Sequence, residues 1–578
     1  MQNPTSKKIL IADIETNNLL LDVNKFHVGA TIDFHTNEIF TTRDADEYAR
    51  HLNTADIVIG HNWSGYDKPA MAILSNIKPT YKYFDTLIMS RLLYYYRDAS
   101  FGHSLNIWGT RLGEFKTDYT GGFETYSQEM EDYCIQDVRV TLLLYKHLSE
   151  LNFLEDSVFE LEQDFTEIMA EQYIHGIRFD TPMAEKMKED IEKELDIALT
   201  TLLKTFKPSI LKKGPVKTPK KPFVRLGKFT AGPHQPVEIV PFNPGSSNHI
   251  FIWLSRRFPD SVWFVTEKGT PKTGADALRL MFPDEDFLDP LLHYLELIKI
   301  YGQVYNGEGS WLKNEREGRL HHSVNPLGTV SGRSTHSKPN LAQVPAVRSF
   351  MGEEARALFL PDEGHKLVGV DLSGVELRCL AHYLKPYDDG AYSDVILEGD
   401  IHTFNQKTAN LPSRDIAKTF IYASLYGAGD MGVATSTGIS LELASKARKD
   451  FKEGLPALKL LDKDLKKASA KKFVRGINGR RLFVRQSYKA LNVLLQSLGA
   501  YIAKVWVVEA IKEIKKRDLD AHLLLHIHDE VQLSVAPHQA EEVKQIVIDK
   551  AVAAGEILNV GMRIDAEGKI GNNWAETH

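Results

Sequence analysis

Two groups of carboxylates in this chain of 578 residues could each bind a pair of metal ions. In the first group, Asp13 and Glu15 end an apolar run that predicts a buried strand, and alternate residues of a strand face the same side. Asp67 follows a second apolar run, and Tyr133 and Asp137 fall on one face of a predicted helix. Two metal ions held by these acids could activate a water molecule and stabilise the leaving oxygen of a phosphodiester, while the tyrosine orients the water. Any one of these acids alone is more simply a surface carboxylate, but four acids and a tyrosine in this order favour the metal site.

The second group joins Asp371 to Asp529. Asp371 ends an apolar strand that turns into a helix, so we expect its carboxylate at the rim of a sheet. Two apolar runs flank His528, Asp529 and Glu530, which predicts a hairpin with Asp529 at its tip. The triplet alone is more simply a hairpin turn. Two acids on neighbouring strands are, however, the arrangement that two metals between a hydroxyl and a triphosphate require.

A predicted helix between these acids carries two cations and two aromatic residues at a spacing of four. At about 100° per residue a step of four drifts by only about 40°, so Arg414, Lys418, Tyr422 and Tyr426 line one face. This pattern predicts a triphosphate clamp beside a stacking platform. Taken alone it could equally be a packed helix edge with a lysine that reaches to solvent.

The elements that must position these residues indicate several domains. The first 150 residues alternate short apolar strands with helical stretches, which is typical of an α/β unit. Long charged helices follow, and a Pro/Lys/Gly-rich stretch at 207–244 reads as a loop or small insertion. The remainder mixes helices with the strand before Asp371 and the hairpin at Asp529.

Charge and composition leave the partners open. The net charge of −7 argues against a nucleic-acid partner, yet basic residues gather within 212–228 and 463–475. Each cluster could be a solvated face or a linker as readily as a binding surface. Two cysteines, Cys134 and Cys379, provide neither a disulfide framework nor zinc-ligand spacing, which fits a reducing compartment. We also expect no signal peptide and no membrane-spanning segment.

Both groups of acids lie in blocks that resemble known motifs. The blocks at Asp13–Glu15, Asp67 and Tyr133–Asp137 resemble the three exonuclease motifs of the DEDD superfamily, in the variant with a tyrosine in the third motif. Asp85 is a further acid that we expect to be structural. The blocks at 367–378, 414–427 and 523–533 resemble motifs A, B and C of family A DNA polymerases, the bacterial polymerase I class.

The resemblance covers nearly the whole chain and is strongest from His321 onwards. Blocks at 332–345, 399–403, 492–496 and 568–574 are similar to those of the replicative polymerases of T-seven-type bacteriophages. No room remains for a 5′ nuclease, which favours a phage-type replicative enzyme over a full-length bacterial polymerase I.

The resemblance implies a role for each acid. In the exonuclease site, the metal ligands would be Asp13, Glu15, Asp67 and Asp137, and Tyr133 would orient the attacking water. In the polymerase site, Asp371 and Asp529 would hold two metals and Glu530 would assist them.

The resemblance also implies which residues bind nucleotide and DNA. His402, Arg414 and Lys418 would bind the triphosphate, and Lys418 is also placed to protonate the leaving pyrophosphate. Tyr422 would pack on the incoming sugar and, with Glu376, exclude a 2′-hydroxyl; the tyrosine suggests tolerance of dideoxynucleotides. Contacts to primer and template, many of them in the minor groove, would come from Arg333, Gln343, Tyr426, Asn492, Gln496 and His528.

The implied architecture is a multidomain α/β protein with an RNase H-like exonuclease domain followed by a right-hand polymerase. We expect the exonuclease domain at 1–154 and the thumb with connecting region at 155–330. The palm would comprise 331–400 and 486–578, with the fingers at 401–485 between its two parts.

The expected cofactors are two Mg²⁺ ions in each site, with Mn²⁺ as a substitute. The expected partners are primer-template DNA and deoxynucleoside triphosphates, with a phage helicase-primase and a single-strand-binding protein as further candidates. T-seven-type enzymes carry a sizeable thumb insertion that recruits host thioredoxin, whereas the corresponding stretch before Phe242 is short here. We therefore expect no thioredoxin partner, a monomer, no membrane association, and a location in the cytoplasm of an infected bacterium.

Three other functions remain open at this point. A single-subunit RNA polymerase shares the polymerase acids and the lysine of motif B, although Glu376 and the exonuclease motifs argue against it. A non-catalytic DNA-binding platform would have no need of the predicted metal ligands, all of which are present. The third is an exonuclease whose polymerase half only grips DNA, which a selective loss of synthesis in Asp529→Asn would exclude.

Overall fold

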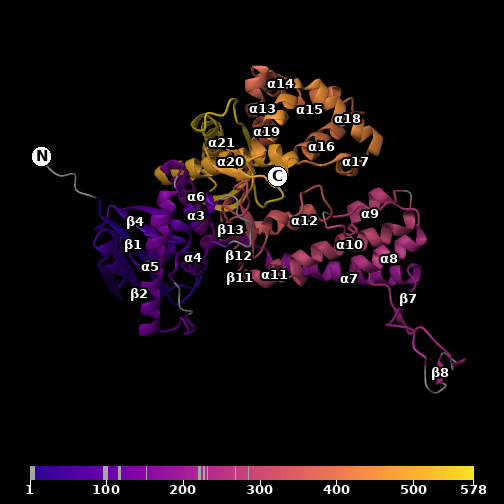
Figure 1. Ribbon diagram of the computed structural model, residues 1–578, viewed down its shortest axis with the longest axis horizontal. Coiled ribbons are helices and arrows are strands. Elements are labelled where there is room, and N and C mark those ends of the chain that lie inside the picture. The colour runs from indigo at the N-terminus through magenta and orange to yellow at the C-terminus, as the bar shows by residue number, and fades with distance from the viewer. Residues whose placement is uncertain are drawn as a thin grey trace. The chain divides into compact units, whose positions relative to one another are not determined.

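The computed structural model describes residues 7–94, 102–114, 119–151, 153–218, 223–225, 228–230, 232–266, 268–283 and 285–578. The chain divides into two compact units, one formed by Met1–Phe179 with Asn314–His578 and the other by Asp180–Lys313 (Figure 1). The second unit lies inside the region 155–330 predicted as thumb and connecting segment. Helix α6 (Asp156–His175) instead packs in the first unit, against helix α20 and strands β5 and β19. The domain boundaries within each unit stay a prediction.

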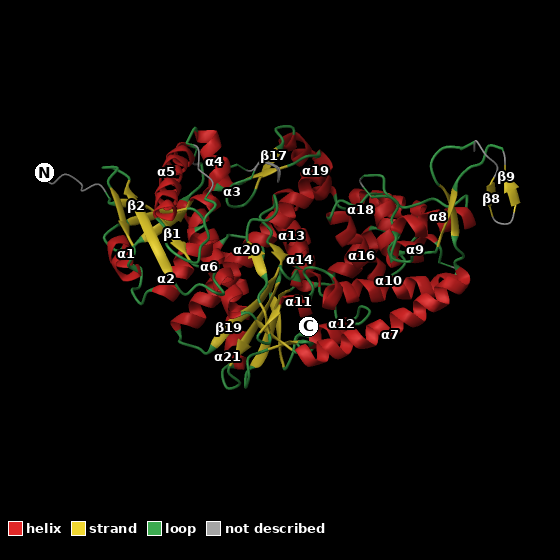
Figure 2. Cartoon of the chain, turned by 90° about the horizontal axis from the view of Figure 1, so that it is seen from below, coloured by secondary structure: helices red, strands yellow, loops and turns green. Residues whose placement is uncertain are grey.

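A mixed five-stranded sheet forms the core of the N-terminal part (Figure 2). Its order is β3-β2-β1-β4-β5, with β1 antiparallel to β2 and parallel to β4. One face of β1 packs toward helix α1 and Trp63, and the other, which carries Ile11, packs against helix α5. Because strand side chains alternate, Asp13 and Glu15 share the face of Ile11. The elements are β1 (Ile9–Thr16), β2 (Phe26–Asp33), β3 (Ile39–Thr42), α1 (Ala45–Leu52), β4 (Ile57–Gly60), η1 (Trp63–Asp67), α2 (Lys68–Leu74), β5 (Lys82–Asp85), α3 (Thr86–Leu93), α4 (Leu105–Leu112) and α5 (Gln128–Glu150).

An antiparallel four-stranded sheet, ordered β19-β20-β16-β21, forms the core of the C-terminal part. Helix α21 packs against β16 and β21, and the Trp506 indole of α20 donates a 2.7 Å hydrogen bond to the backbone oxygen of Val547 in α21. The predicted strand before Asp371 and the predicted hairpin at Asp529 are therefore neighbours in one sheet. The elements are β16 (Lys366–Leu372), α13 (Val375–Asp388), α20 (Ala490–Lys516), β19 (Ala521–Ile527), β20 (Glu530–Val535), α21 (Ala540–Ile557) and β21 (Ala566–Gly571).

A helical subdomain is inserted between β16 and α20. Helix α16 buries Ala417, Phe420, Ile421 and Leu425 in the core, so the opposite face is left for Arg414, Lys418 and Tyr422. Three of the four residues predicted from the spacing of four thus share one face of the helix, and the fourth, Tyr426, follows the last turn as its C-cap residue. The helices are α14 (Ala391–Glu398), α15 (Ile401–Thr408), α16 (Arg414–Leu425), α17 (Asp430–Thr437), α18 (Leu441–Gly454) and α19 (Pro456–Ser469), followed by strands β17 (Phe473–Arg475) and β18 (Arg481–Phe483).

Short strands connect the two sheets within the first unit. Strands β11, β12, β6 and β15 form a small sheet in that order, and β13 pairs with β14. These elements are β6 (Ile177–Phe179), β11 (Glu315–Arg316), β12 (Arg319–Leu320), β13 (Ser323–Asn325), β14 (Thr335–Ser337), η4 (Leu341–Gln343), α12 (Gly352–Ala357) and β15 (Phe359–Leu360).

The second unit is helical, with two short antiparallel strand pairs. Helices α7 and α10 pack together, and Leu202, Phe206, Leu254 and Leu291 lie in its core. Strand β7 pairs with β10, and β8 with β9. The elements are α7 (Thr181–Thr205), β7 (Ser209–Lys212), β8 (Phe223–Arg225), β9 (Lys228–Thr230), β10 (Val237–Val240), α8 (Ser247–Arg257), α9 (Ala275–Met281), α10 (Asp289–Tyr301), the π-helical turn η3 (Gly302–Asn306) and α11 (Trp311–Asn314), which ends at the boundary with the first unit.

Helix α20 was not anticipated as a long apolar segment. Residues Ser487–Lys516 are long and apolar enough to cross a membrane by length and composition, but 61% of the most apolar window is buried inside the protein. Helices α6, α13 and α21 pack around it, which accounts for its composition.

A buried ion pair joins α20 to α6. The Lys504 ammonium lies 2.6 Å from the Glu162 carboxylate and donates a second bond, of 2.9 Å, to the backbone oxygen of Pro326. Both charged side chains are only 2% exposed. Burial lowers the pKa of Lys504, and the charge of Glu162 opposes this shift.

Replacing one partner of this pair leaves the other charge buried without its counterion. We expect Lys504→Met to lower the free energy of unfolding by about 3–5 kcal/mol, measured as a drop in the midpoint of urea unfolding. Lys512 and Asp164 form a 2.7 Å pair between the same two helices, with side chains 57% and 36% exposed. Lys512→Met is therefore the matched control, with an expected loss below about 1 kcal/mol. Equal losses in the two variants would show that burial does not set the energy of the Lys504 pair.

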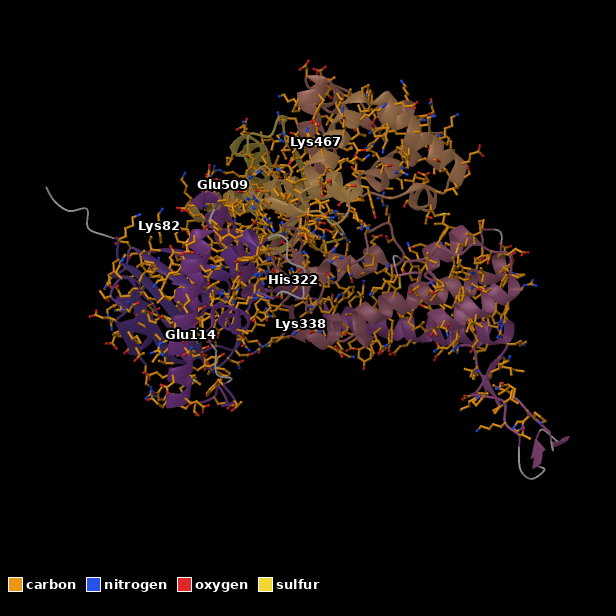
Figure 3. The ribbon with its side chains drawn as sticks, in the orientation of Figure 1. Lys82, Glu114, His322, Lys338, Lys467 and Glu509 are labelled. Atoms are coloured by element: carbon orange, nitrogen blue, oxygen red, sulfur yellow. The ribbon has the colours of Figure 1, made fainter. Side chains whose placement is uncertain are left out.

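Three imidazoles run from the core toward the hairpin of Asp529. His322, labelled in Figure 3, stacks on His336 with ring centroids 5.9 Å apart, and His336 meets His528 edge-on at 5.5 Å. The side-chain nitrogen of Gln172 lies 3.0 Å from Nε2 of His322. Burial, followed by the charge of neighbouring histidines, lowers the pKa of His322 to about 3.

A histidine whose pKa is lowered on folding destabilises the folded state in acid. Above the unfolded pKa of about 6.5 the stability is complete, and it falls with pH until the folded pKa is reached. Between about pH 6.5 and about pH 5.5, His322→Gln should therefore lose about 1 kcal/mol less unfolding free energy than the parent protein. Thermal midpoints at both pH values measure this difference, and His538→Gln, at an exposed histidine, is the control. An unchanged pH slope in His322→Gln would contradict the assignment.

Candidate active sites

Asp371 and Asp529 lie side by side where the inner strand β16 ends and the hairpin between β19 and β20 turns; this rim of the C-terminal sheet is the sheet edge that carries the acids. Pairing of β16 with β20 sets Asp371 opposite Glu530, and the backbone N–H of Leu372 donates a 2.9 Å bond to the backbone oxygen of Asp529. His528 turns the chain between β19 and β20 with φ of 63°. Two acids far apart in sequence are thus held together by the strand register.

Crowding of acids shifts the pKa of both aspartates. Burial and the charges of Asp529, Glu530 and Glu376 raise the pKa of Asp371 to about 8. Burial and the charge of Glu376 raise the pKa of Asp529 to about 6, although Arg333 opposes the shift. A site with this surplus of negative charge and with carboxylate oxygens as donors fits hard divalent cations such as Mg²⁺ or Mn²⁺.

Glu530 is turned away from this edge into a buried network. Its carboxylate accepts hydrogen bonds from the Trp574 indole at 2.5 Å and from Gln532 at 2.7 Å. Burial would raise the pKa of Glu530, but the hydrogen bond from His578 and the charge of Arg356 outweigh it and lower the pKa. Glu530 thus anchors the start of β20, directly after Asp529, and its predicted role of assisting the metals stays a prediction.

The cationic face of α16 lies beside helix α15. The Arg414 guanidinium donates bonds of 2.7 and 3.2 Å to Asp400, which also caps the N-terminus of α15 by accepting from the backbone of His402. Burial and the charges of Arg414 and Lys418 lower the pKa of His402. The three predicted triphosphate ligands, Arg414, Lys418 and His402, are therefore brought together. The motif did not reveal that Asp400 engages Arg414.

Tyr422 and Tyr426 both approach Glu376, in different ways. The Tyr426 hydroxyl donates a 2.7 Å bond to the Glu376 carboxylate. Burial and the charges of Glu376, Asp529 and Asp371 raise the pKa of Tyr422 to about 12. The ring of Tyr422 also lies 6.4 Å from that of His402. This face of α16 is thus directed toward the carboxylates.

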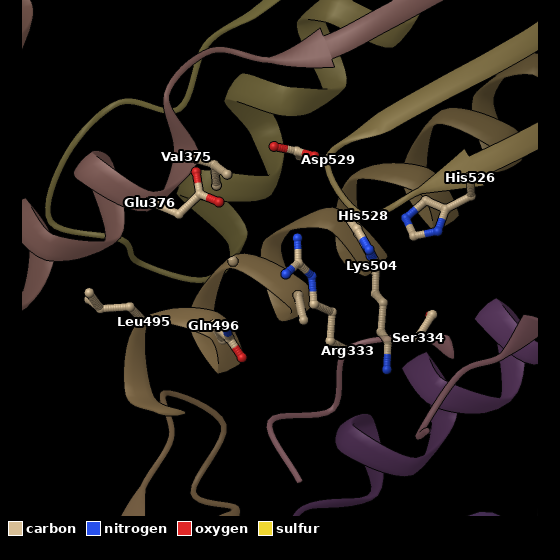
Figure 4. Close-up of a pocket in the computed structure, with 12 residues that line it drawn as sticks. Arg333, Ser334, Val375, Glu376, Leu495, Gln496, Lys504, His526, His528 and Asp529 are labelled. Atoms are coloured by element: carbon tan, nitrogen blue, oxygen red, sulfur yellow. The ribbon is translucent and has the colours of Figure 1, made fainter. Parts of the chain in front are cut away.

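A pocket at the sheet edge collects several of the predicted DNA contacts (Figure 4). Arg333, Gln496 and His528 line it together with Glu376 and Asp529. Figure 4 shows the guanidinium of Arg333 between Glu376 and His528. The described lining of this pocket does not include the other three predicted contacts, Gln343, Tyr426 and Asn492. Gln343 ends the turn η4, Tyr426 bonds to Glu376, and Asn492 donates to the backbone oxygen of Leu425 at 3.4 Å.

The predicted N-terminal acids lie on β1, at the end of η1 and on α5. Carboxylate oxygens of Asp13 and Glu15 and the sulfur of Cys134 all lie within 4.8 Å of one another. Asp67 ends the π-helical turn η1; burial and the charges of Asp85 and Glu15 raise its pKa. Asp137 is also buried and interacts electrostatically with Cys134. This donor set fits divalent cations, as predicted for its acids.

Tyr133 and Asp85 are two further residues of the N-terminal part whose neighbours are identified. The ring of Tyr133 is half-buried beside that of Tyr119, with centroids 5.5 Å apart. Asp85 caps α3 and accepts bonds of 2.9 and 3.0 Å from the backbones of Asn62 and Ser64. Asp85 therefore shapes the turn that presents Asp67, which confirms its expected structural role. Cys134 was not among the predicted ligands, because the two cysteines of the chain have no metal-ligand spacing.

Comparison with known proteins agrees with this geometry. The family model "DNA polymerase family A" matches residues 225–576. The DNA-directed DNA polymerases of Enterobacteria phage T3 and Escherichia phage T7 are each 32% identical to this chain, and the alignments cover 99% of it and 100% of the relative. The thermostable DNA polymerase I of Thermus filiformis is 27% identical over 72% of this chain and 48% of its own length.

A solved structure has the same fold. The POL domain of Pol1 from M. smegmatis, in complex with DNA primer-template and dNTP, matches with a TM-score of 0.79 and 19% identity, over 99% of this chain and 96% of that one. The multidomain α/β polymerase fold and the resemblance to phage polymerases are thereby confirmed, and the chain belongs to DNA polymerase family A.

Proposed function

We propose that the protein extends a primer 3′ end on a DNA template with deoxynucleotides and removes mispaired ends with a 3′→5′ exonuclease. The observation that carries the first activity is the placement of Asp371 and Asp529 at one sheet edge, facing the Arg414–Tyr426 side of α16. Family membership supports the same activity. The gathering of Asp13, Glu15, Asp67 and Asp137 around β1 supports the second.

Asp371 and Asp529 would hold two Mg²⁺ ions, which supply charge stabilisation for the attacking and leaving oxygens. Arg414 and His402 bind the triphosphate, so Arg414 must exchange Asp400 for phosphate oxygens. Lys418 is exposed on the same face and donates a proton to the leaving pyrophosphate. A fingers movement that closes on a correct nucleotide would assemble this clamp only for that nucleotide.

The residues around the pocket select the sugar of the incoming nucleotide and check the base pair at the primer end. Tyr422 packs on the incoming sugar, and Glu376, held by Tyr426, leaves no room for a 2′-hydroxyl. This selection disfavours the alternative of an RNA polymerase. Arg333, Gln496 and His528 contact the primer end, where minor-groove acceptors are shared by all base pairs.

In the exonuclease site, Asp13, Glu15, Asp67 and Asp137 would likewise hold two divalent ions, and Tyr133 orients the attacking water. Both sites compete for one primer end. A mispaired end frays more readily, and the exonuclease receives it as a single strand.

The two activities should be separable by single substitutions. In a gel assay with labelled primer, template and Mg²⁺, Asp529→Asn should slow extension by more than about 100-fold and keep the exonuclease, and Asp13→Ala should do the reverse. Asp549→Asn on α21 and Asp132→Asn on α5 are exposed controls on the same parts of the chain. Loss of both activities in either active-site variant would contradict two independent sites, and persistent extension in Asp529→Asn would remove Asp529 from the mechanism.

We further propose that synthesis does not depend on thioredoxin. The alignments to the two phage polymerases run over 719 positions, so these relatives carry residues that this chain of 578 lacks. In the basic segment, Lys213 pairs with Glu238 at 3.1 Å, while Lys220 and Lys221 lie outside the described residues. Direct neutralisation of DNA phosphates by this segment would replace a recruited clamp.

Product length tests this independence. At fixed salt, excess thioredoxin should leave the length of products from one binding event unchanged, because the short segment offers no insertion for it to bind. Replacing Lys212, Lys213 and Lys217 with glutamine should shorten the products and weaken their salt dependence. A several-fold lengthening on addition of thioredoxin would overturn the proposal.

The proposed setting follows from the phage relatives. A monomer in the cytoplasm of an infected bacterium would act there on primer-template DNA, with a helicase-primase and a single-strand-binding protein as the proposed partners. Mn²⁺ is the proposed substitute for Mg²⁺ in both sites.

A further inference from the structure

A cysteine thiol stands among the carboxylates of the N-terminal site. Cys134 lies on the buried face of α5, one turn before Asp137, and its side chain is fully buried. Its Sγ lies 3.5 Å from Oδ2 of Asp13 and 3.6 Å from the backbone oxygen of the same residue. The thiol therefore enters the site from the helix, while Asp13 and Glu15 enter from the strand.

The spacing of these donors matches a thiolate–carboxylate cation site. In a tetrahedral zinc site with Zn–S of about 2.3 Å and Zn–O of about 2.1 Å, sulfur and oxygen are about 3.6 Å apart. The Sγ to Oδ2 separation of 3.5 Å is already close to that value. A carboxylate oxygen of Glu15 lies within 4.8 Å of the sulfur and of a carboxylate oxygen of Asp13, so side-chain rotations could bring all three donors to one cation.

The polymerase site has a different donor set. Its acids, Asp371, Asp529 and Glu376, offer oxygen, and the described lining of the pocket adds the imidazole of His528 but no thiol. The chain has one other cysteine, Cys379, which is fully buried in the core on α13. Soft metals prefer a thiolate, whereas Mg²⁺ and Mn²⁺ prefer oxygen ligands, so the two sites should rank cations differently.

We propose that Asp13, Glu15 and Cys134 form a binding site for thiophilic divalent cations such as Zn²⁺ and Cd²⁺, through which these ions occupy the exonuclease site in preference to the polymerase site. On binding, a metal–sulfur bond forms, the S–H proton passes to solvent, and the contact from Sγ to Asp13 is replaced by a shared metal. The consequence is a protein that loses proofreading before synthesis when such ions are present. The inference concerns the exonuclease assigned under the proposed function and rests on it.

Spectroscopy tests the metal–sulfur bond without any nuclease activity. The full chain is titrated with Cd²⁺, and the ultraviolet sulfur-to-cadmium charge-transfer band is recorded for the parent, Cys134→Ala and the matched core variant Cys379→Ala. We expect the band to saturate at one equivalent in the parent and in Cys379→Ala, and to vanish in Cys134→Ala. A band that survives in Cys134→Ala, or that is absent from the parent, would overturn the proposal.

Activity measurements then test selectivity within one molecule. In Mg²⁺, added Cd²⁺ or Zn²⁺ should inhibit primer shortening in the parent at concentrations that leave extension unchanged. In Cys134→Ala and Cys134→Ser, each normalised to its own rate in Mg²⁺ alone, the inhibitory concentration should rise by at least about 10-fold. Intact extension verifies that the variants fold. Equal inhibition of the parent and both variants would refute the role of the thiol.

The two measurements separate the cation site from the exonuclease assignment. A cadmium band in a parent protein that never shortens a primer would remove the exonuclease function and leave the cation site standing. Primer shortening without a cadmium band would keep the exonuclease and remove the site.

Discussion

The repulsion among carboxylates at one sheet edge is the constraint on which the polymerase site depends. Strand register fixes Asp371 opposite Glu530, and the turn at His528 sets Asp529 beside them. In the free protein, protonation relieves part of this repulsion, since the pKa of Asp371 rises to about 8 and that of Asp529 to about 6. It also turns Glu530 inward to Trp574 and Gln532. Two acids are thereby left for cations, whose charge relieves the repulsion.

The same constraint shapes the surroundings of the site. Arg333 offsets part of the negative charge at Asp529, but two further cations are paired with other acids: Arg414 with Asp400, and Lys504 with Glu162. The edge therefore stays negative until metal and nucleotide bring their own charges. Because Arg414 and Asp400 are both exposed, their pairing is weak enough to be exchanged for a triphosphate, whereas the buried Lys504–Glu162 pair is suited to a permanent joint between α20 and α6.

The N-terminal site also crowds carboxylates together, but a thiol lies among them. Its acids come from a strand, a turn and a helix, and burial raises the pKa of Asp67 as it does that of Asp371. A thiol occupies one side of this cluster, whereas the described lining of the polymerase pocket contains carboxylates and imidazoles but no thiol. Two sites that use one kind of chemistry can thus differ in the cations they accept, because ligand softness depends on a single side chain.

The sequence alone determined the local features of this protein. The two-residue repeat placed Asp13 and Glu15 on one face of a strand, the spacing of four placed Arg414, Lys418 and Tyr422 on one face of α16, and flanking apolar runs predicted the hairpin at Asp529, because these patterns depend on neighbours along the chain. Resemblance supplied the family, which the comparisons confirmed. Tertiary structure alone decided what meets across long sequence separations: Glu376 with Tyr426, Glu530 with Trp574, Lys504 with Glu162, and Cys134 with Asp13. Such contacts depend on strand register and helix packing, which no local pattern encodes.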